Sequence, residues 1–259
     1  MINSTSNKQI KRVVNLRSKS KARREEGVYV AEGLRMCREF SPREVEVLYV
    51  TEDFAASREN RKWMEDFRWE MVTDIVMNFM ADTKTPQGVL AVAKQRSHTL
   101  DSLLSGKGPA CLMILETLQD PGNLGTILRA GEGAGITGIV MNRECADIYS
   151  PKVIRSTMGS ILRVPFVYAD DFQPAIRKIK ESGIRLFAAH LEGANNYDKE
   201  DYTGNVGFII GNEGSGLTAE TAALADARVK IPMAGKVESL NAAIASSILM
   251  FETARQRRR

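Results

Sequence analysis

Polar side chains that can do chemistry occupy three glycine-containing loops of this 259-residue chain. Asn123 lies in the first loop and Glu213 in the second, while Ser239 and Asn241 lie in the third. Arg129 follows Asn123 by six residues, just inside a predicted helix. An amide, a carboxylate and a hydroxyl can orient an oxygen nucleophile, and a permanently charged guanidinium can bind an anionic group. These residue types are compatible with catalysis by orientation and electrostatic stabilisation, but taken alone they are equally typical of a surface arginine and of turn or helix-cap residues.

Each of the three loops follows a short apolar strand, and these strands must position the polar side chains. We expect them over residues 111–115, 206–210 and 229–231. Short apolar strands separated by helices are typical of an α/β fold with a parallel sheet covered on both faces. Because the carboxyl ends of parallel strands lie at one edge of a sheet, the loops should form one composite pocket.

Other elements of this half follow from its apolar runs and turn residues. Further strands are expected over residues 138–141, 161–164 and 186–189, and helices over residues 124–132 and 241–257. Ser150 should cap another helix, with Pro151 at its first position.

Gly133, Gly135 and Gly138 spell G-x-G-x-x-G, the fingerprint of a dinucleotide-binding loop. That fingerprint needs a strand before it and a helix after it, whereas here a predicted helix comes first and a strand follows. The glycines are therefore interpreted as helix-terminating residues in left-handed conformations.

The first hundred residues predict a smaller α/β unit. Strands are expected over residues 28–31, 45–50 and 89–93, and helices over residues 33–40, 58–67 and 74–80. Ser105, Gly106, Gly108 and Pro109 then indicate a linker. We therefore expect one domain at residues 1–100, a linker at 101–109 and a second domain at 110–259.

Positive charge is concentrated at both ends of the chain, although the formal net charge is only +4. Residues 1–24 hold eight Lys or Arg and no acidic residue, and the chain ends Arg255, Gln256, Arg257, Arg258, Arg259. Such ends favour polyanions such as RNA, although charge runs are often only solvated faces. Ile10, Val13 and Val14 have helical spacing, so the basic start is interpreted as part of the fold and not as a transit peptide.

The three cysteines, Cys37, Cys111 and Cys145, are odd in number and lack C-x-x-C spacing. They predict reduced, buried thiols and a cytoplasmic location. With His98 and His190 they form no zinc set, so we expect no metal. No apolar run approaches the roughly 20 residues that cross a bilayer, so we expect no membrane segment.

In order and spacing, the three loops resemble the motifs of the SpoU (TrmH-like) RNA ribose methyltransferases of the SPOUT superfamily. Motif one, N-x-G-x-x-x-R, is met by Asn123, Gly125 and Arg129; motif two, G-x-E-x-x-G, by Gly211, Glu213 and Gly216; motif three, I-P-M-x-G-x-x-x-S-L-N, by residues 231–241. Ala242 and Ala243 stand where the family more often has Val and Ser. The resemblance covers residues 110–257 closely and residues 8–95 more loosely.

The resemblance implies a SPOUT domain with a C-terminal trefoil knot, preceded by an L30e-like RNA-binding domain. It implies methylation of a ribose 2′-oxygen in RNA with S-adenosyl-L-methionine as cofactor, by a homodimer that needs no metal. The residues implied for cofactor binding are Ala189, Gly211, Ile231 and Leu240. Those implied to face the ribose are Arg129, Glu213, Ser239 and Asn241, with Asn123 in support. Arg155 and Ser156 also resemble a family segment beside the active site.

Other functions remain open at this point. One is a non-catalytic RNA-binding protein with a degenerate methyltransferase domain, against which the intact Arg129, Glu213 and Asn241 argue. Another is a base methyltransferase on the same fold, which the ribose type of motif three disfavours. Ribosomal RNA is favoured over tRNA because the two-domain form commonly acts on ribosomal RNA.

Overall fold

A computed structural model describes residues 1–191 and 195–258 of the chain, so Arg259 of the basic C-terminus lies outside the described residues. Contacts divide the chain into two compact units. Unit 1 consists of Met1–Arg96 and Asp147–Gly159, and unit 2 consists of Ser97–Ala146 and Ser160–Arg259.

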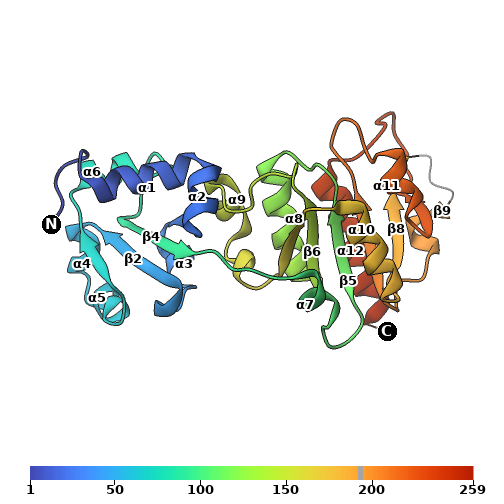
Figure 1. Cartoon of the computed structure of the whole chain (residues 1–259), viewed down its shortest axis with the longest axis horizontal. Coiled ribbons are helices and arrows are strands. Elements are labelled where there is room, and N and C mark those ends of the chain that lie inside the picture. The colour runs from blue at the N-terminus through green and yellow to red at the C-terminus, as the bar shows by residue number, and fades with distance from the viewer. Residues whose placement is uncertain (192–194, 259) are drawn as a thin grey trace. The chain divides into compact units, whose positions relative to one another are not determined.

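Within the described residues, unit 2 is built on a seven-stranded sheet in the order β7-β6-β5-β10-β8-β11-β9 (Figure 1). All neighbouring strands run parallel, as predicted. β5, β6 and β10 are buried along their whole length, which explains why they read as unbroken apolar runs. The strands are β5 (Cys111–Leu115), β6 (Gly138–Asn142), β7 (Phe166–Ala169), β8 (Arg185–Ala189), β9 (Asn195–Asn196), β10 (Val206–Ile210) and β11 (Ala227–Lys230).

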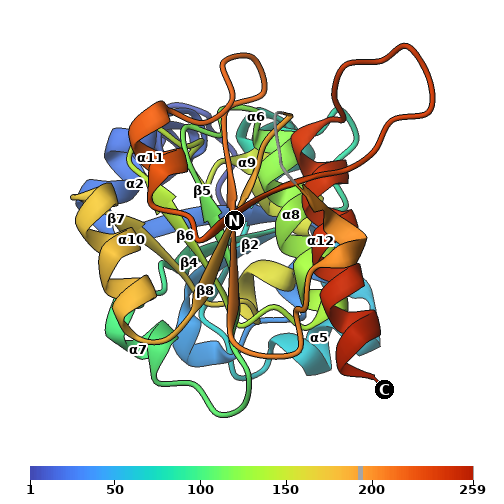
Figure 2. The same ribbon diagram turned by 90° about the vertical axis from the view of Figure 1, so that its right-hand side faces the viewer.

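Helices cover both faces of this sheet. On one face, α7 (Leu100–Leu104) and α10 (Phe172–Glu181) share a buried apolar cluster with β5, β6, β8 and β10. On the other, α8 (Pro121–Ala134) packs along α12 (Ala242–Arg257) (Figure 2). The remaining elements are α11 (Ala219–Ala223) and the short 3-10 turns Ser160–Leu162 and Tyr197–Lys199. α7 lies inside the predicted linker.

Gly131 of α8 lies close to neighbouring side chains. A Cβ there would lie 2.3 Å from Ile136 Cδ1, so the Ile136 side chain would have to move, whereas Met250 Sδ of α12 at 3.4 Å is within ordinary contact distance. Gly135 ends α8 in the left-handed region, with φ 78°. The interpretation of the G-x-G-x-x-G glycines as a helix terminus is confirmed at this residue.

The predicted strand over residues 161–164 is wrong. Residues Ser160–Leu162 form a 3-10 turn, and the strand β7 begins at Phe166. Pro165 lies between them and has no N–H to donate to a sheet, so the ladder starts only after it. The apolar side chains of the turn are buried all the same, which is why the segment resembled a strand.

Unit 1 has a mixed four-stranded sheet in the order β1-β4-β2-β3, counted over the described residues. α1 and α6 bury Ile10, Val13, Val76 and Met77 in a cluster with the sheet residue Leu90. The expected helices over residues 33–40 and 58–67 are real but shorter. The elements are α1 (Lys8–Ser18), α2 (Ser20–Glu26), β1 (Val28–Glu32), α3 (Leu34–Cys37), a 3-10 turn (Pro42–Glu44), β2 (Val45–Val50), α4 (Glu52–Ala56), α5 (Arg58–Met64), β3 (Trp69–Met71), α6 (Asp74–Met80), β4 (Val89–Lys94) and α9 (Pro151–Thr157).

The segment Asp147–Gly159, which contains α9, belongs to unit 1 although it lies between β6 and β7 in sequence. Asp147 accepts hydrogen bonds from the buried Arg23 at 2.6 and 2.9 Å. Arg155 of α9 donates to Asp82 at 2.5 Å. Ser150 is the N-cap residue of α9 and Pro151 is its first residue, as predicted, but the Ser150 side chain makes no capping hydrogen bond and its buried hydroxyl has no partner among the described residues.

None of the helices in the described residues combines the length and apolar character that a membrane span requires. Over the same part of the chain, no three His, Cys, Asp or Glu side chains gather in a way that could hold a metal ion.

Candidate active site

The three motif loops meet at one edge of the unit 2 sheet. β10 lies between β5 and β8, and β8 also pairs with β11, so the carboxyl ends of these four parallel strands are neighbours. Motif one follows β5, motif two follows β10 and motif three follows β11. The predicted composite site is therefore assembled by strand order.

A chain of side-chain hydrogen bonds joins the three motifs. Asn241 Nδ2 donates to Asn123 Oδ1 at 2.9 Å, and Asn123 Nδ2 donates to Glu213 Oε1 at 2.9 Å. The backbone N–H of Asp120 also donates to Glu213 Oε1, at 3.4 Å. Each asparagine donates from its amide nitrogen to the next residue, so the hydrogen bonds run from Asn241 through Asn123 to Glu213. This pattern determines the orientation of both side-chain amides.

Asn241 also begins α12. Its Oδ1 accepts hydrogen bonds from the backbone N–H groups of Ala243 and Ile244 at 2.9 and 3.3 Å. The capping interpretation of Asn241 is therefore confirmed, and its predicted functional role is compatible with it, because the oxygen and the nitrogen of the amide bond to different partners.

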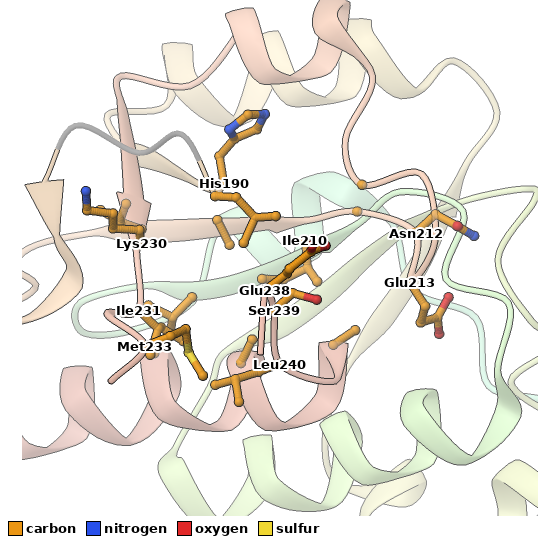
Figure 3. Close-up of a pocket in the computed structure, with 18 of the residues that line it drawn as sticks. His190, Ile210, Asn212, Glu213, Lys230, Ile231, Met233, Glu238, Ser239 and Leu240 are labelled. Carbon is orange, nitrogen blue, oxygen red and sulfur yellow. The ribbon is translucent and has the colours of Figure 1, made fainter. Parts of the chain in front are cut away.

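A cavity of about 200 Å³ opens beside this hydrogen-bonded chain. Ala189, Gly211, Ile231 and Leu240, the four residues predicted to bind a cofactor, all line it. Glu213 and Ser239 line it too, as do His190, Lys230, Met233 and Glu238 (Figure 3). The structure thus brings the four predicted cofactor residues to one cavity with two of the five predicted catalytic residues, Glu213 and Ser239. Asn123, Asn241 and Arg129 do not line it.

Gly211 is required by the closure of the motif-two loop. A Cβ there would lie 2.3 Å from the carbonyl carbon of Gly216 and 2.4 Å from the nitrogen of Leu217. Its φ is not positive, so the constraint is steric and does not come from a left-handed backbone. Asn212 and Gly216 close the loop with two backbone hydrogen bonds of 3.0 Å.

A polar network that the sequence reasoning missed supports the motif-two loop. Thr117 has a positive φ of 55°, which is unfavourable for a β-branched residue. Asn142 stabilises it by accepting from the Thr117 N–H at 2.8 Å and donating to the Thr117 hydroxyl at 2.9 Å. The Thr117 carbonyl then accepts from Asn212 Nδ2 at 2.9 Å, directly before Glu213.

Glu116 is a second residue that the motifs did not indicate. Its side chain is buried, and it accepts from the backbone and hydroxyl of Thr218 at 2.8 Å each and from the Thr221 hydroxyl at 2.5 Å. It thereby ties the end of β5 to the start of α11. An acidic residue directly after a fully apolar strand is the sequence signal that could have identified it.

Arg129 and Ser239 lie apart from the hydrogen-bonded chain. Arg129 is exposed on α8 and forms no hydrogen bond or ion pair with a described residue. Six residues separate it from Asn123, which places it about 120° around the helix from that side chain. Ser239 is exposed at the cavity. Arg155 and Ser156, in unit 1, bond to Asp82 and to the Lys152 carbonyl.

The geometry agrees with comparisons to known proteins. The model of the SpoU rRNA Methylase family matches residues 110–251, and that of an MRM3-like substrate binding domain matches residues 7–91. The chain belongs to the SpoU rRNA methylase family. The first match spans the three motif loops and the cavity, so it covers all the site residues predicted from the motifs.

Individual relatives and solved structures are also similar to this chain. An uncharacterized tRNA/rRNA methyltransferase of Synechocystis sp. is 37% identical over 72% of this chain and 67% of its own. A 23S rRNA (guanosine-2′-O-)-methyltransferase of Ralstonia nicotianae is 31% identical over 79% of this chain and 86% of its own. The crystal structure of an AdoMet-bound rRNA methyltransferase from Sinorhizobium meliloti has a TM-score of 0.87 at 30% identity, covering 98% and 97% of the two chains. The α/β SPOUT architecture predicted for unit 2 is confirmed.

Proposed function

We propose that this chain transfers a methyl group from S-adenosylmethionine to a ribose 2′-oxygen of ribosomal RNA. The observation that carries the proposal is the hydrogen-bonded chain Asn241–Asn123–Glu213 beside a cavity lined by all four predicted cofactor residues. Several relatives are 23S rRNA 2′-O-methyltransferases, which supports ribosomal RNA as the substrate.

The cavity has the groups that a nucleoside cofactor needs. The backbone N–H groups of Gly211, Ile231 and Leu240 donate no hydrogen bond to any described residue, so they can pair with the polar edges of a ligand. Ile210 and Leu249 add apolar surface for a flat ring. When bound there, S-adenosylmethionine supplies a methyl group activated by a positively charged sulfur.

Glu213 and its partners orient the ribose in this proposal. Glu213 Oε1 already accepts from Asn123 and Asp120, whereas Oε2 accepts nothing from the described residues. Oε2 can therefore accept a hydrogen bond from a ribose hydroxyl, and the Ser239 hydroxyl can donate to the same sugar or its phosphate. Correct orientation of two reactants can supply roughly 7–11 kcal/mol of a reaction barrier.

Arg129 is proposed to bind the RNA and to stabilise charge as the hydroxyl proton leaves. Because it lies on a different side of α8 from Asn123, we propose that it acts on the site of a second copy of the chain in a homodimer. Ile244 and Phe251, seven residues apart on α12, are large exposed apolar residues that support such an interface. The aromatic ring of Phe251 reaches α8 near Gly133, so this apolar surface adjoins the helix that carries Arg129.

Unit 1 is proposed to recognise the RNA, since it matches a substrate binding domain. Of its basic N-terminal residues, Arg12, Arg17 and Arg23 are engaged within the fold, whereas Lys8, Lys11, Lys19 and Arg24 are exposed and form no ion pair among the described residues. The buried, unpaired thiols of Cys37, Cys111 and Cys145 support a reducing, cytoplasmic location.

The test combines binding and transfer on one pair of variants. Arg129→Ala should retain S-adenosylmethionine affinity by calorimetry but lose tritiated methyl transfer to ribosomal RNA by at least about a hundredfold, the usual scale for losing one electrostatic stabiliser. Arg177→Ala, an exposed arginine on α10, is the matched control and should keep both. Turnover of Arg129→Ala within a few-fold of wild type would contradict the assignment, and absence of cofactor binding to wild type would contradict the function.

A further inference from the structure

Glu238 places a carboxylate at the cavity, and it is not among the motif residues to which a role was assigned above. It lines the cavity together with Ser239 and Leu240, and its side chain extends from the motif-three loop toward the centre of the cavity (Figure 3). It forms no hydrogen bond or ion pair with a described residue. Its negative charge therefore has no partner within the protein.

Other charged groups of the cavity do not neutralise Glu238. Lys230 is the basic residue that lines the cavity with His190, and Figure 3 shows its side chain extending away from Glu238. Glu213 adds a second negative charge, but its Oε1 atom is already held by Asn123 and Asp120. The part of the cavity near Glu238 is therefore suited to a positively charged ligand atom.

We propose that Glu238 makes this site selective for the positively charged methyl donor over the neutral reaction product. The inference rests on the proposed function. Methyl transfer breaks the bond from sulfur to the methyl carbon and forms the bond from that carbon to the ribose oxygen, while the hydroxyl proton is released. The sulfonium becomes an uncharged thioether, S-adenosylhomocysteine, so the attraction to Glu238 is present before transfer and lost after it.

Donor and product differ only in the methyl group and the charge on sulfur, so the change in the ratio of their affinities when Glu238 loses its charge reports the attraction between Glu238 and the sulfonium. Calorimetry on the full-length protein should measure S-adenosylmethionine, S-adenosylhomocysteine and sinefungin, in which an ammonium group replaces the sulfonium. Glu238→Gln keeps the shape of the side chain and removes its charge. Glu220→Gln on α11 is the matched control, because Glu220 is exposed and does not line the cavity.

Glu238→Gln should weaken S-adenosylmethionine and sinefungin by about fivefold or more and leave S-adenosylhomocysteine within twofold, since only charged ligands lose an attraction. Glu220→Gln should change none of the three. Equal weakening of all three ligands by Glu238→Gln, or no weakening of any, would overturn the proposal while leaving the proposed function intact. Failure of the wild-type protein to bind either donor or product would overturn the proposed function, and this inference with it.

Discussion

Asn241 serves the helix with one atom of its amide and the active site with the other. Its oxygen caps α12, and its nitrogen donates to Asn123, which in turn donates to Glu213. Stability and catalysis should therefore respond differently to substitutions that remove one atom or both.

Asn241→Asp keeps the capping oxygen and removes the donor. Asn123 must then turn its amide, which places its oxygen against Glu213 Oε1 and opposes two acceptors. We expect methyl transfer to fall by at least about tenfold with little change in melting temperature, because the cap remains. Asn241→Ala should lose both the capping oxygen and the donating nitrogen, so it should also lower the free energy of unfolding by about 1 kcal/mol. Thermal denaturation and a methyl-transfer assay on both variants check these predictions. Equal melting temperatures for the two variants would contradict the idea that the oxygen serves stability and the nitrogen serves catalysis.

At this scale, the resemblance of the three loops to the family motifs predicted the residues that meet. Asn123, Glu213 and Asn241 lie up to 118 residues apart in sequence, yet they form one hydrogen-bonded chain. Thr117, Asn142 and Glu116 could not be predicted in the same way. Thr117 matters because its backbone is strained, and Glu116 and Asn142 matter because they are buried. Strain and burial depend on tertiary neighbours, which cannot be read from the sequence.

Among the elements, the motif-two loop depends on the close approach of its two ends. Gly211→Ala should weaken S-adenosylmethionine by at least about tenfold, because the added Cβ must push Gly216 away and such overpacking costs about 1–3 kcal/mol. Gly204→Ala is the matched control, since a Cβ there meets nothing within 4 Å. Calorimetry on both variants tests the prediction, and unchanged affinity in a folded Gly211→Ala protein would show that the cofactor lies elsewhere.

Some basic side chains of α1 and α2 are hydrogen-bonded within the fold, and others are exposed to solvent. Arg23 is 4% exposed and donates to Asp147 and to the carbonyls of Leu16 and Arg17. Arg23→Gln should therefore destabilise unit 1 by about 3–5 kcal/mol, because it leaves Asp147 without its cation. Thermal denaturation measures this loss.

Lys11 and Arg24 are exposed on the same helices, and we expect them to contact phosphate. The pair of substitutions Lys11→Gln and Arg24→Gln should keep stability but reduce the salt dependence of RNA binding by about one unit of slope per charge. Filter binding at several salt concentrations tests this. A slope equal to that of wild type would show that the RNA does not contact this surface.

Element prediction was most accurate for strands that are buried on both faces. β5 and β10 begin and end where the apolar runs predict, because both strands are buried along their whole length. It failed at residues 160–165, where an equally apolar segment forms a turn before Pro165. The helices α7, α10 and α11 were not predicted. Each has few turns, so its apolar residues repeat too few times to show helical spacing in the sequence.

For the whole molecule, the proposed exchange of Arg129 between two chains has a direct test. Alone, the Arg129→Ala and Asn241→Asp proteins should each retain no more than about a tenth of wild-type activity. After unfolding and refolding together, about a quarter of wild-type activity should be observed, because half the dimers are mixed and each mixed dimer has one intact site. If Arg129 acts within its own chain, the mixture stays at or below the activity of the separate variants. Analytical ultracentrifugation would confirm that dimers form.

The large-scale architecture could be predicted in part. The parallel sheet of unit 2 follows from its alternating apolar strands and helices. The trefoil knot stays a prediction, because threading is not encoded in strand periodicity. The inclusion of Asp147–Gly159 in unit 1 has no local signal at all, since it depends on partners such as Arg23 and Asp82 more than 70 residues away.

That inclusion has a consequence for the order in which the protein can fold during synthesis. When residue 96 has left the ribosome, unit 1 still lacks Asp147–Gly159, so Arg23 and Asp82 lack their ion-pair partners Asp147 and Arg155. About 60 more residues must follow, which takes about 3–12 s at translation rates of roughly 5–20 residues per second. During that interval unit 1 lacks this segment, while the strands β5 and β6 of unit 2 are already being synthesised. Synthesis of the two units therefore overlaps, because unit 1 is complete only after β5 and β6 of unit 2 have been made, and a pause in translation between residues 97 and 146 would prolong the exposure of an unfinished core.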